Sequence, residues 1–127
     1  MTVGGTQTLT GKTLTSPNLT TPRTTSVVYA ETDGATVTFN ANNGLRQKVT
    51  LAGNRNLTVS NLADGEKMEL WIFQDGTGSR TATWTVITIR WDGGSFTALT
   101  TTPSKADCIF IQRIGSEYFG SYATRGA

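Results

Sequence analysis

The residue types that carry out chemistry are scarce in this chain. It contains no His and a single Cys, which excludes His-dependent catalytic triads, His-ligated zinc and a disulfide framework within the chain. Cys108 alternates with Phe110 in an apolar run, where a small buried residue is typical, and no His is present to activate its thiolate. We therefore predict a structural cysteine and a protein that is not an enzyme and needs no metal or other cofactor.

The acidic residues are poorly placed for catalysis or metal binding. The loop 75–79, Asp-Gly-Thr-Gly-Ser, lacks the Gly-Lys-Ser/Thr ending of a phosphate-binding loop and the regularly spaced acids of a calcium loop. Glu66 and Glu69 stand on either side of the start of an expected strand and point to opposite faces. We therefore predict that the loop is a hairpin turn and that the two glutamates do not form an acid and base pair.

Aromatic residues in expected strands offer a different chemistry, stacking against a sugar. The candidates are Trp84, Trp91, Tyr118 and Tyr122, although strand aromatics more often fill a core. The Asn-Leu-Thr triplets 18–20 and 56–58 match the N-glycosylation signal. The start of the chain lacks the basic and apolar stretches of a signal peptide, so we assign no glycan to these triplets.

The composition indicates strands and turns. Only 16% of the residues are charged and 36% are hydrophobic, while about a fifth are Thr, whose branched side chain suits a pleated sheet. A net charge of +2 is too small to imply a nucleic-acid partner. No apolar run approaches the roughly 18 to 20 residues of a membrane span, so we expect no membrane partner.

Residues 1–25, here called the leader, contain a five-residue repeat. Leu9, Leu14 and Leu19 recur every five residues, and each is followed by Thr. This spacing fits neither a helical face nor a plain strand, and Pro17 and Pro22 exclude a helix interior. We expect short extended pieces with kinks between them, forming an arm that packs on another chain. The arm's candidate binding residues are Leu9, Lys12, Leu14, Leu19 and Arg23, of which Lys12 and Arg23 are its charges.

Residues 26–127 are expected to form one β-sandwich domain. Short runs of alternating or β-branched residues are separated by turn signals such as Asp33-Gly34 at roughly ten-residue intervals. Eight or nine such strands match an antiparallel, jelly-roll-like sandwich in size. The expected strands are 27–31, 36–39, 47–51, 56–60, 67–74, 81–91, 96–100, 108–114 and 117–123.

Two of these strands carry more apolar residues than one face needs. In 67–74 the residues Trp71 and Phe73 make the second face apolar as well, and in 81–91 the buried phase changes at 86–87. The change of phase predicts a bulge or corner. We predict that the surplus around Trp71, Phe73, Trp84 and Trp91 forms a subunit interface, although a well-filled core would also account for it.

The leader also resembles a known family. The string Gly-Gly-Thr-Gln-Thr-Leu-Thr-Gly-Lys-Thr-Leu-Thr-Ser-Pro at 4–17 is similar to the TLTNKTLTSP leader of tailed-bacteriophage structural proteins, with Gly11 in place of the commoner Asn. The segments 49–59 and 74–80 resemble the small β-domains that follow such leaders in capsid decoration proteins and tail fibres.

This resemblance implies a virion protein made in the host cytoplasm. The function it favours is a capsid decoration, or cement, protein on the capsid surface. As a homotrimer, such a protein would bridge neighbouring copies of the major capsid protein. The alternative is a tail or head fibre component that binds a host receptor, and only then would a host surface glycan be a partner.

Overall fold

The computed structural model describes residues 8–21 and 27–127. Within them the protein is almost entirely β, as the composition predicts. The described residues contain nine strands and one short 3-10 turn, η1. Their bounds are β1 Tyr29–Ala30, β2 Thr36–Asn40, η1 Ala41–Asn43, β3 Arg46–Leu51, β4 Arg55–Ser60, β5 Lys67–Gln74, β6 Ala82–Trp84, β7 Ile89–Trp91, β8 Ala106–Ile114 and β9 Glu117–Thr124.

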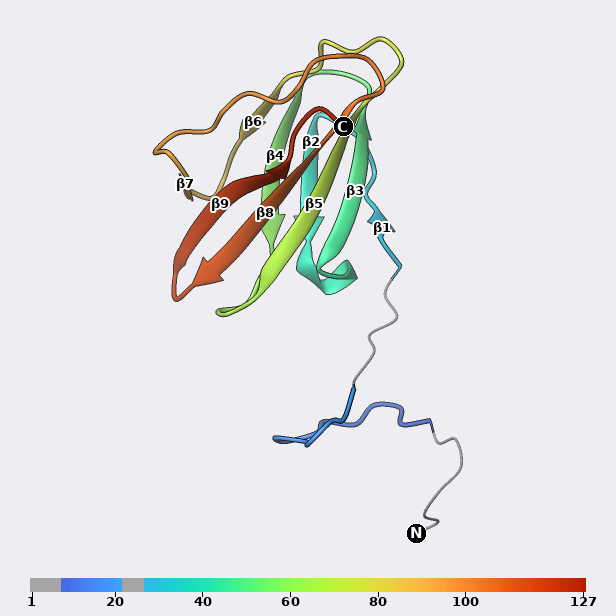
Figure 1. Ribbon diagram of the computed structural model, residues 1–127, viewed down its shortest axis with the longest axis vertical. Helices are drawn as coiled ribbons and strands as arrows, with labels where there is room; N and C mark the ends of the chain where they lie inside the picture. The colour runs from blue at the N-terminus through green and yellow to red at the C-terminus, as the bar shows by residue number, and fades with distance from the viewer. Residues whose placement is uncertain (1–7, 22–26) are drawn as a thin grey trace.

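From β1 to β6 the chain winds back and forth between two sheets (Figure 1). The odd-numbered strands β1, β3 and β5 lie side by side in one sheet, and β2, β4 and β6 lie in the other. Neighbours within each set are parallel, so that Thr36 of β2, for example, lies opposite Asn56 of β4. One strand from each sheet makes a rung. The body, residues 27–127, stacks the three rungs β1–β2, β3–β4 and β5–β6.

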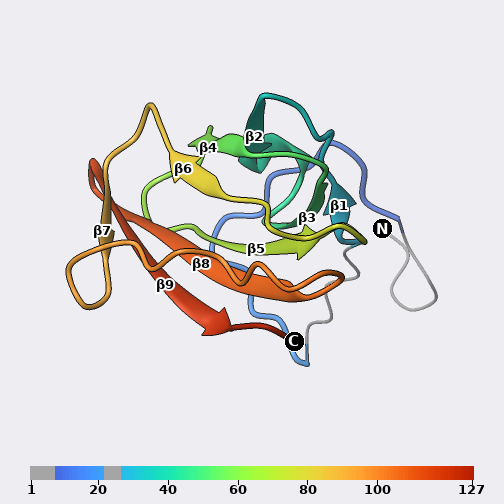
Figure 2. The ribbon, with the colours of Figure 1, turned by 90° about the horizontal axis from the view of Figure 1, so that it is seen from above.

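The last three strands complete the larger sheet in another way. β8 pairs antiparallel with β5, β9 turns back antiparallel to β8, and β7 adds parallel to β9. The sheet orders are therefore β1-β3-β5-β8-β9-β7 and β2-β4-β6. Seen from above, the two sheets form two layers, with β1 and β2 at one side of the body and β6 and β7 at the other (Figure 2).

The expectation of an antiparallel sandwich is wrong for most of the strand pairs. Only β5–β8 and β8–β9 are antiparallel among the described strands, and the jelly-roll arrangement is not confirmed. The turn signals after β1, β2 and β3 carry the chain across to the other sheet instead of reversing it within one sheet. Gly44, for instance, adopts φ 126° after η1 and links β2 to β3 in the opposite layer.

Two expected strands also differ from the structure. The run 81–91 is two strands, because Val86 adopts φ 71° and the Ile87 N–H bonds back to the Thr85 carbonyl oxygen. This break confirms the corner predicted at 86–87. The run 96–100 forms no strand and is irregular backbone. It is held by the Tyr122 hydroxyl, which donates to the Thr97 carbonyl oxygen at 2.5 Å.

The core lies between the two sheets. Side chains alternate along β5, so that Met68, Leu70 and Ile72 face inward and are buried. They meet inward residues of the smaller sheet such as Phe39 and Leu57, both 0% exposed. At roughly 1.5 to 3 kcal/mol for each large apolar side chain, this burial is the main source of stability.

A buried carboxylate ties the C-terminal end to the core. Asp107 in β8 is 1% exposed and accepts hydrogen bonds from the Thr100 N–H at 2.7 Å, the Thr100 hydroxyl at 2.9 Å and the Gly126 N–H at 2.8 Å. Next to it, Ala106 and Ala127 exchange two backbone hydrogen bonds. One side chain therefore fixes both the irregular segment before β8 and the end of the chain.

Among residues 8–21 and 27–127, no helix is long and apolar enough to cross a membrane.

Candidate functional site

The described part of the leader exposes the three repeated leucines. Leu9, Leu14 and Leu19 are 63%, 56% and 58% exposed. The backbone repeats with the same period, because Gly11, Ser16 and Thr21 all adopt positive φ, at 61°, 47° and 49°. These turns are the kinks that the sequence predicts between short extended pieces.

Of the two charged residues in the leader, the structure describes only Lys12. Lys12 is exposed beside the first kink, and Arg23 lies outside the described residues. The prediction that the leader is an arm packed on another chain stays a prediction. Three apolar side chains repeated on an open backbone are the surface that such packing would cover.

The outer face of the larger sheet carries a second apolar surface. Trp71 and Phe73 of β5 point away from the core and are half-buried, because they alternate with the inward residues of that strand. Phe110 of β8 and Phe119 of β9 lie on the same face through the pairs Glu69–Phe110 and Gln112–Phe119. Sequence analysis did not select Phe110 or Phe119 for this face, because only the strand pairing brings them onto the face that carries Trp71.

Two cations cover the aromatic rings on this outer face. The Lys67 Nζ lies 4.8 Å from the centre of the Phe110 ring, and the Arg90 guanidinium lies 5.3 Å from the centre of the Phe119 ring. Between them is a groove of about 570 Å³, here called the outer groove, which Ser121 also lines. Cations over aromatic rings at exposed sites contribute about 0.5 to 1 kcal/mol each, so they partly shield this face from water.

Trp84 and Trp91 lie elsewhere, between the free edges of the two sheets. Their ring centroids are 5.6 Å apart, and Phe96 packs on both of them, at 6.2 Å from Trp84 and 4.8 Å from Trp91. Beside this cluster is a groove of about 490 Å³, here called the edge groove. It is lined by uncharged residues only: Ala82, Thr83, Trp84, Ile87, Thr88, Ile89, Trp91 and Phe96.

The four residues predicted as one interface therefore fall on two surfaces. Trp71 and Phe73 share the outer face of the larger sheet, whereas Trp84 lines the edge groove and Trp91 lines both the edge groove and the outer groove. The indole Nε1 of Trp84 is buried without a hydrogen-bond partner in the described residues. An unsatisfied buried donor is uncommon in folded proteins.

The four residues considered as a sugar platform do not share one open surface. Tyr122 stacks on Phe96 at 6.1 Å, and its hydroxyl is bound to the Thr97 carbonyl oxygen. Burial raises the pKa of Tyr122 to about 12. Tyr118 packs against the core and is covered by the Arg113 guanidinium, 5.8 Å from its ring centre. Only Trp84 and Trp91 of the four line a groove.

The groups considered for catalysis are engaged in the fold. Cys108 is 1% exposed, and burial raises the pKa of its thiol to about 11, so the thiolate is scarce at neutral pH. Glu66 accepts from the Ala63 N–H and Glu69 pairs with Arg46 at 2.5 Å. Within residues 8–21 and 27–127, no three His, Cys, Asp or Glu side chains gather as a metal site.

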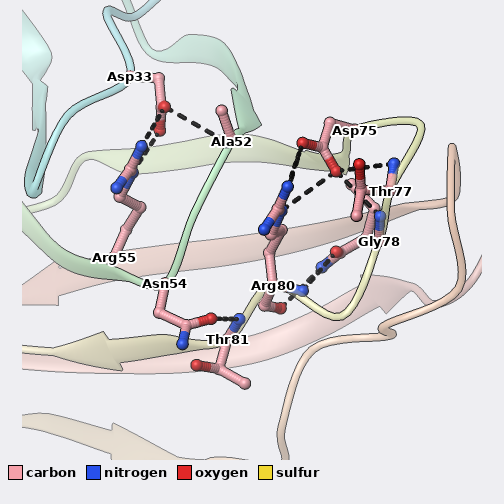
Figure 3. Close-up of polar contacts among 10 residues, drawn as sticks. Asp33, Ala52, Asn54, Arg55, Asp75, Thr77, Gly78, Arg80 and Thr81 are labelled. Atoms are coloured by element: carbon pink, nitrogen blue, oxygen red, sulfur yellow. Dashed lines mark hydrogen bonds and ion pairs between the residues drawn. The ribbon is translucent and has the colours of Figure 1, made fainter.

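The loop 75–79 folds around its own aspartate (Figure 3). The Asp75 carboxylate accepts from the Gly78 N–H at 2.9 Å and the Thr77 N–H at 3.1 Å, and Arg80 pairs with it at 2.8 Å. A similar pair joins Asp33 to Arg55 at 2.7 Å. Both carboxylates are satisfied by protein groups, so in this structure they stabilise turns. The prediction of a hairpin turn at 75–79 is wrong, because this loop carries the chain from β5 in the larger sheet to β6 in the smaller sheet.

The Asp75 contacts predict a pH dependence of stability. Hydrogen bonds from Arg80 and then from the Gly78 N–H lower the pKa of Asp75 from 3.8 to about 2. A carboxylate with a lowered pKa stabilises the fold above its unfolded pKa, and this contribution disappears as the pH falls through the folded value. We expect the urea concentration at the midpoint of unfolding to decrease as the pH is lowered from about 4 to about 2. The decrease should be smaller in Asp75→Asn.

Urea titrations of both proteins across this range would measure the effect. Because all other carboxylates are common to the two proteins, their difference isolates Asp75. Parallel curves would contradict the prediction.

Comparison with protein-family models, with curated proteins and with solved structures finds no match for this chain.

Proposed function

We propose that this protein is a bacteriophage capsid decoration protein that stabilises the head shell by bridging neighbouring copies of the major capsid protein. The observation that supports this most is the leader. It presents Leu9, Leu14 and Leu19 to solvent on a backbone that kinks every five residues. The resemblance of 4–17 to phage leaders gives this exposed repeat a context, the surface of a virion.

The energetics of such a protein follow from its leader. A protein that binds the assembled shell stabilises that state by RT ln(1 + [L]/Kd) at each site. A homotrimer with three leaders would engage several sites at once and gain avidity. Because leader residues 8–21 carry one charge, Lys12, the contacts would be apolar side chains and backbone hydrogen bonds to sheet edges.

Deletion of residues 1–25 tests this function. The body buries its own core without the leader, so we expect the shortened protein to remain folded by circular dichroism. It should lose binding to purified shells in a sedimentation assay. Binding of the full chain should change little in a few hundred millimolar salt, because few charges are involved. Shells that bind the shortened protein equally well would contradict the proposal.

The outer groove is the observation that favours the alternative, a fibre component that binds a host receptor. Its Phe110 and Phe119 rings lie beside Lys67, Arg90 and Asp92, and aromatic surface beside polar groups suits a sugar. Arg90 is itself paired with Glu117 at 3.1 Å. The number of copies per particle separates the two functions. Hundreds of copies over the shell would support decoration, and a few copies at one vertex would support a fibre.

A further inference from the structure

We propose that the leader segment 18–20 of one copy adds as a strand to the free edge of β6 in a second copy, with Leu19 seated in the edge groove. This link joins copies of the chain to each other and goes beyond the proposed function. It leaves Leu9 and Leu14 of the leader free for another partner.

The first reason is the sequence of the segment itself. Asn18-Leu19-Thr20 is identical to Asn56-Leu57-Thr58 in β4, the strand next to β6. In β4, Leu57 points into the core and is 0% exposed, and it lies opposite Trp84 of β6. The leader therefore contains the same three residues that already form a strand of this sheet.

The other strands of the smaller sheet follow the same pattern. β2 contains Thr36-Val37-Thr38, with Val37 1% exposed, and Thr81-Ala82-Thr83 leads into β6. Val37 and Leu57 are buried and Ala82 packs against the core, so the central residue of each triplet lies on the inner side, as alternation along a strand requires. A leader triplet added to this sheet would place Leu19 on the same side as Trp84.

The second reason is that β6 offers an unfilled edge. In the described residues β6 pairs with β4 alone, so its other side has unpaired backbone groups. The inner residues at the opposite edge, Val37 and Phe39 of β2, are 1% and 0% exposed, so a strand added there would bury little. Beside β6 the edge groove remains open, with about 490 Å³ between uncharged walls. The uncharged segment 18–20 matches those walls.

The topology indicates that the groove belongs to a second copy. The leader enters the body at β1, whereas β6 and β7 lie at the opposite side (Figure 2). The acceptor strand β6 lies two strand spacings of about 4.8 Å from β2 in the smaller sheet, and that sheet is about 10 Å from the sheet that contains β1. The nine Cα–Cα steps from Thr20 to Tyr29 span at most about 32 Å when fully extended, and a leader bound to its own groove would have to use this length to pass around the outside of the body. A neighbouring groove needs no such path.

A contact of this kind is heterologous, because one copy donates and the next accepts. Such contacts close into rings when the rotation between copies permits. A ring of three would produce the homotrimer expected from the sequence. Each leader would then be bound through Leu19 to the edge groove of the next copy.

Two single variants and a control test the link. Leu19→Asp removes the donor by placing a charge against an apolar groove, and Thr88→Arg obstructs the acceptor at an exposed lining residue. Leu9→Asp is the matched control, with the same change in a leader unit outside the proposed contact. Light scattering over a range of concentrations should show wild type and Leu9→Asp associating alike. The other two should be folded by circular dichroism, with association at least about 100-fold weaker.

Mixing the two defective variants gives the sharpest result. Leu19→Asp retains its groove and Thr88→Arg retains its leader, so the mixture should form a one-to-one dimer that neither protein forms alone. A mixture that stays monomeric would overturn the proposal, as would a wild type that is monomeric at all concentrations. Association of Leu19→Asp equal to wild type would also overturn it. Shell binding is measured separately and tests the proposed function. A failure of the link between copies can therefore be distinguished from a failure of the proposed function.

Discussion

Replacing Asp107 with alanine is expected to lower the free energy of unfolding by about 3 to 5 kcal/mol. The change would leave the Thr100 N–H, the Thr100 hydroxyl and the Gly126 N–H without their acceptor in a buried site. Each buried donor left unsatisfied costs about 1 to 3 kcal/mol. The effect should be large because one carboxylate ties two segments to β8, the irregular segment that contains Thr100 and the end of the chain.

Chemical denaturation with urea would measure this loss. Asp92→Ala is the matched control, because Asp92 is exposed and its removal should change stability by less than about 0.5 kcal/mol. Hydrogen exchange should also show faster exchange of the Thr100 and Gly126 amides in Asp107→Ala. Equal unfolding energies for the two variants would refute the role assigned to Asp107.

A second large effect is expected at Gly78, where alanine should destabilise the protein by about 3 kcal/mol. Gly78 adopts φ 71°, and an added Cβ would lie 2.6 Å from the Thr101 carbonyl oxygen and 2.8 Å from the Pro103 nitrogen. Both neighbours are backbone atoms and cannot turn aside as a side chain would. The strain of a left-handed residue and the cost of overpacking add, at about 1 to 3 kcal/mol each.

Gly76 in the same loop provides the control for this prediction. An added Cβ at Gly76 would meet nothing within 4 Å, and its φ lies outside the left-handed range. Gly76→Ala should therefore be neutral or slightly stabilising, because it restricts the unfolded chain. Thermal unfolding of the two variants side by side would decide the matter, and similar losses for both would contradict the steric explanation.

Much of the fold follows from the sequence, because alternation and turn residues locate most strands directly. The expected strand 67–74 matches β5, and 117–123 differs from β9 by one residue. The direction of the strands could not be predicted from the sequence, because the same turn residues occur in hairpins and in connections between the two sheets. Gly115, with φ 63°, turns a hairpin between β8 and β9, whereas Gly44 at φ 126° carries the chain to the other sheet. Only contacts between residues distant in sequence separate these cases.

The candidate surfaces show the same limit. Alternation along one strand put Trp71 and Phe73 on the face opposite Met68, and the structure shows that this is the outer face. The repeated leucines were visible in the sequence as a five-residue spacing. The separation of Trp84 and Trp91 from Trp71 could not be derived, because it depends on which strands occupy the sheet edges. The outer groove was missed for the same reason, since Lys67 reaches Phe110 across a strand pair.

The winding of β1 to β6 has a consequence for how such chains change in length. Each rung contacts only its neighbours through parallel pairs with offsets of similar size, for example Thr36 with Asn56 and Gln47 with Leu70. In stacked architectures of this kind, stability is nearly a sum over units and the interfaces between them. Duplication of a segment of about twenty residues spanning β3 and β4 would therefore insert a whole rung and leave the β8–β9 hairpin unchanged. Related chains with taller bodies could arise by this route without redesign of either end.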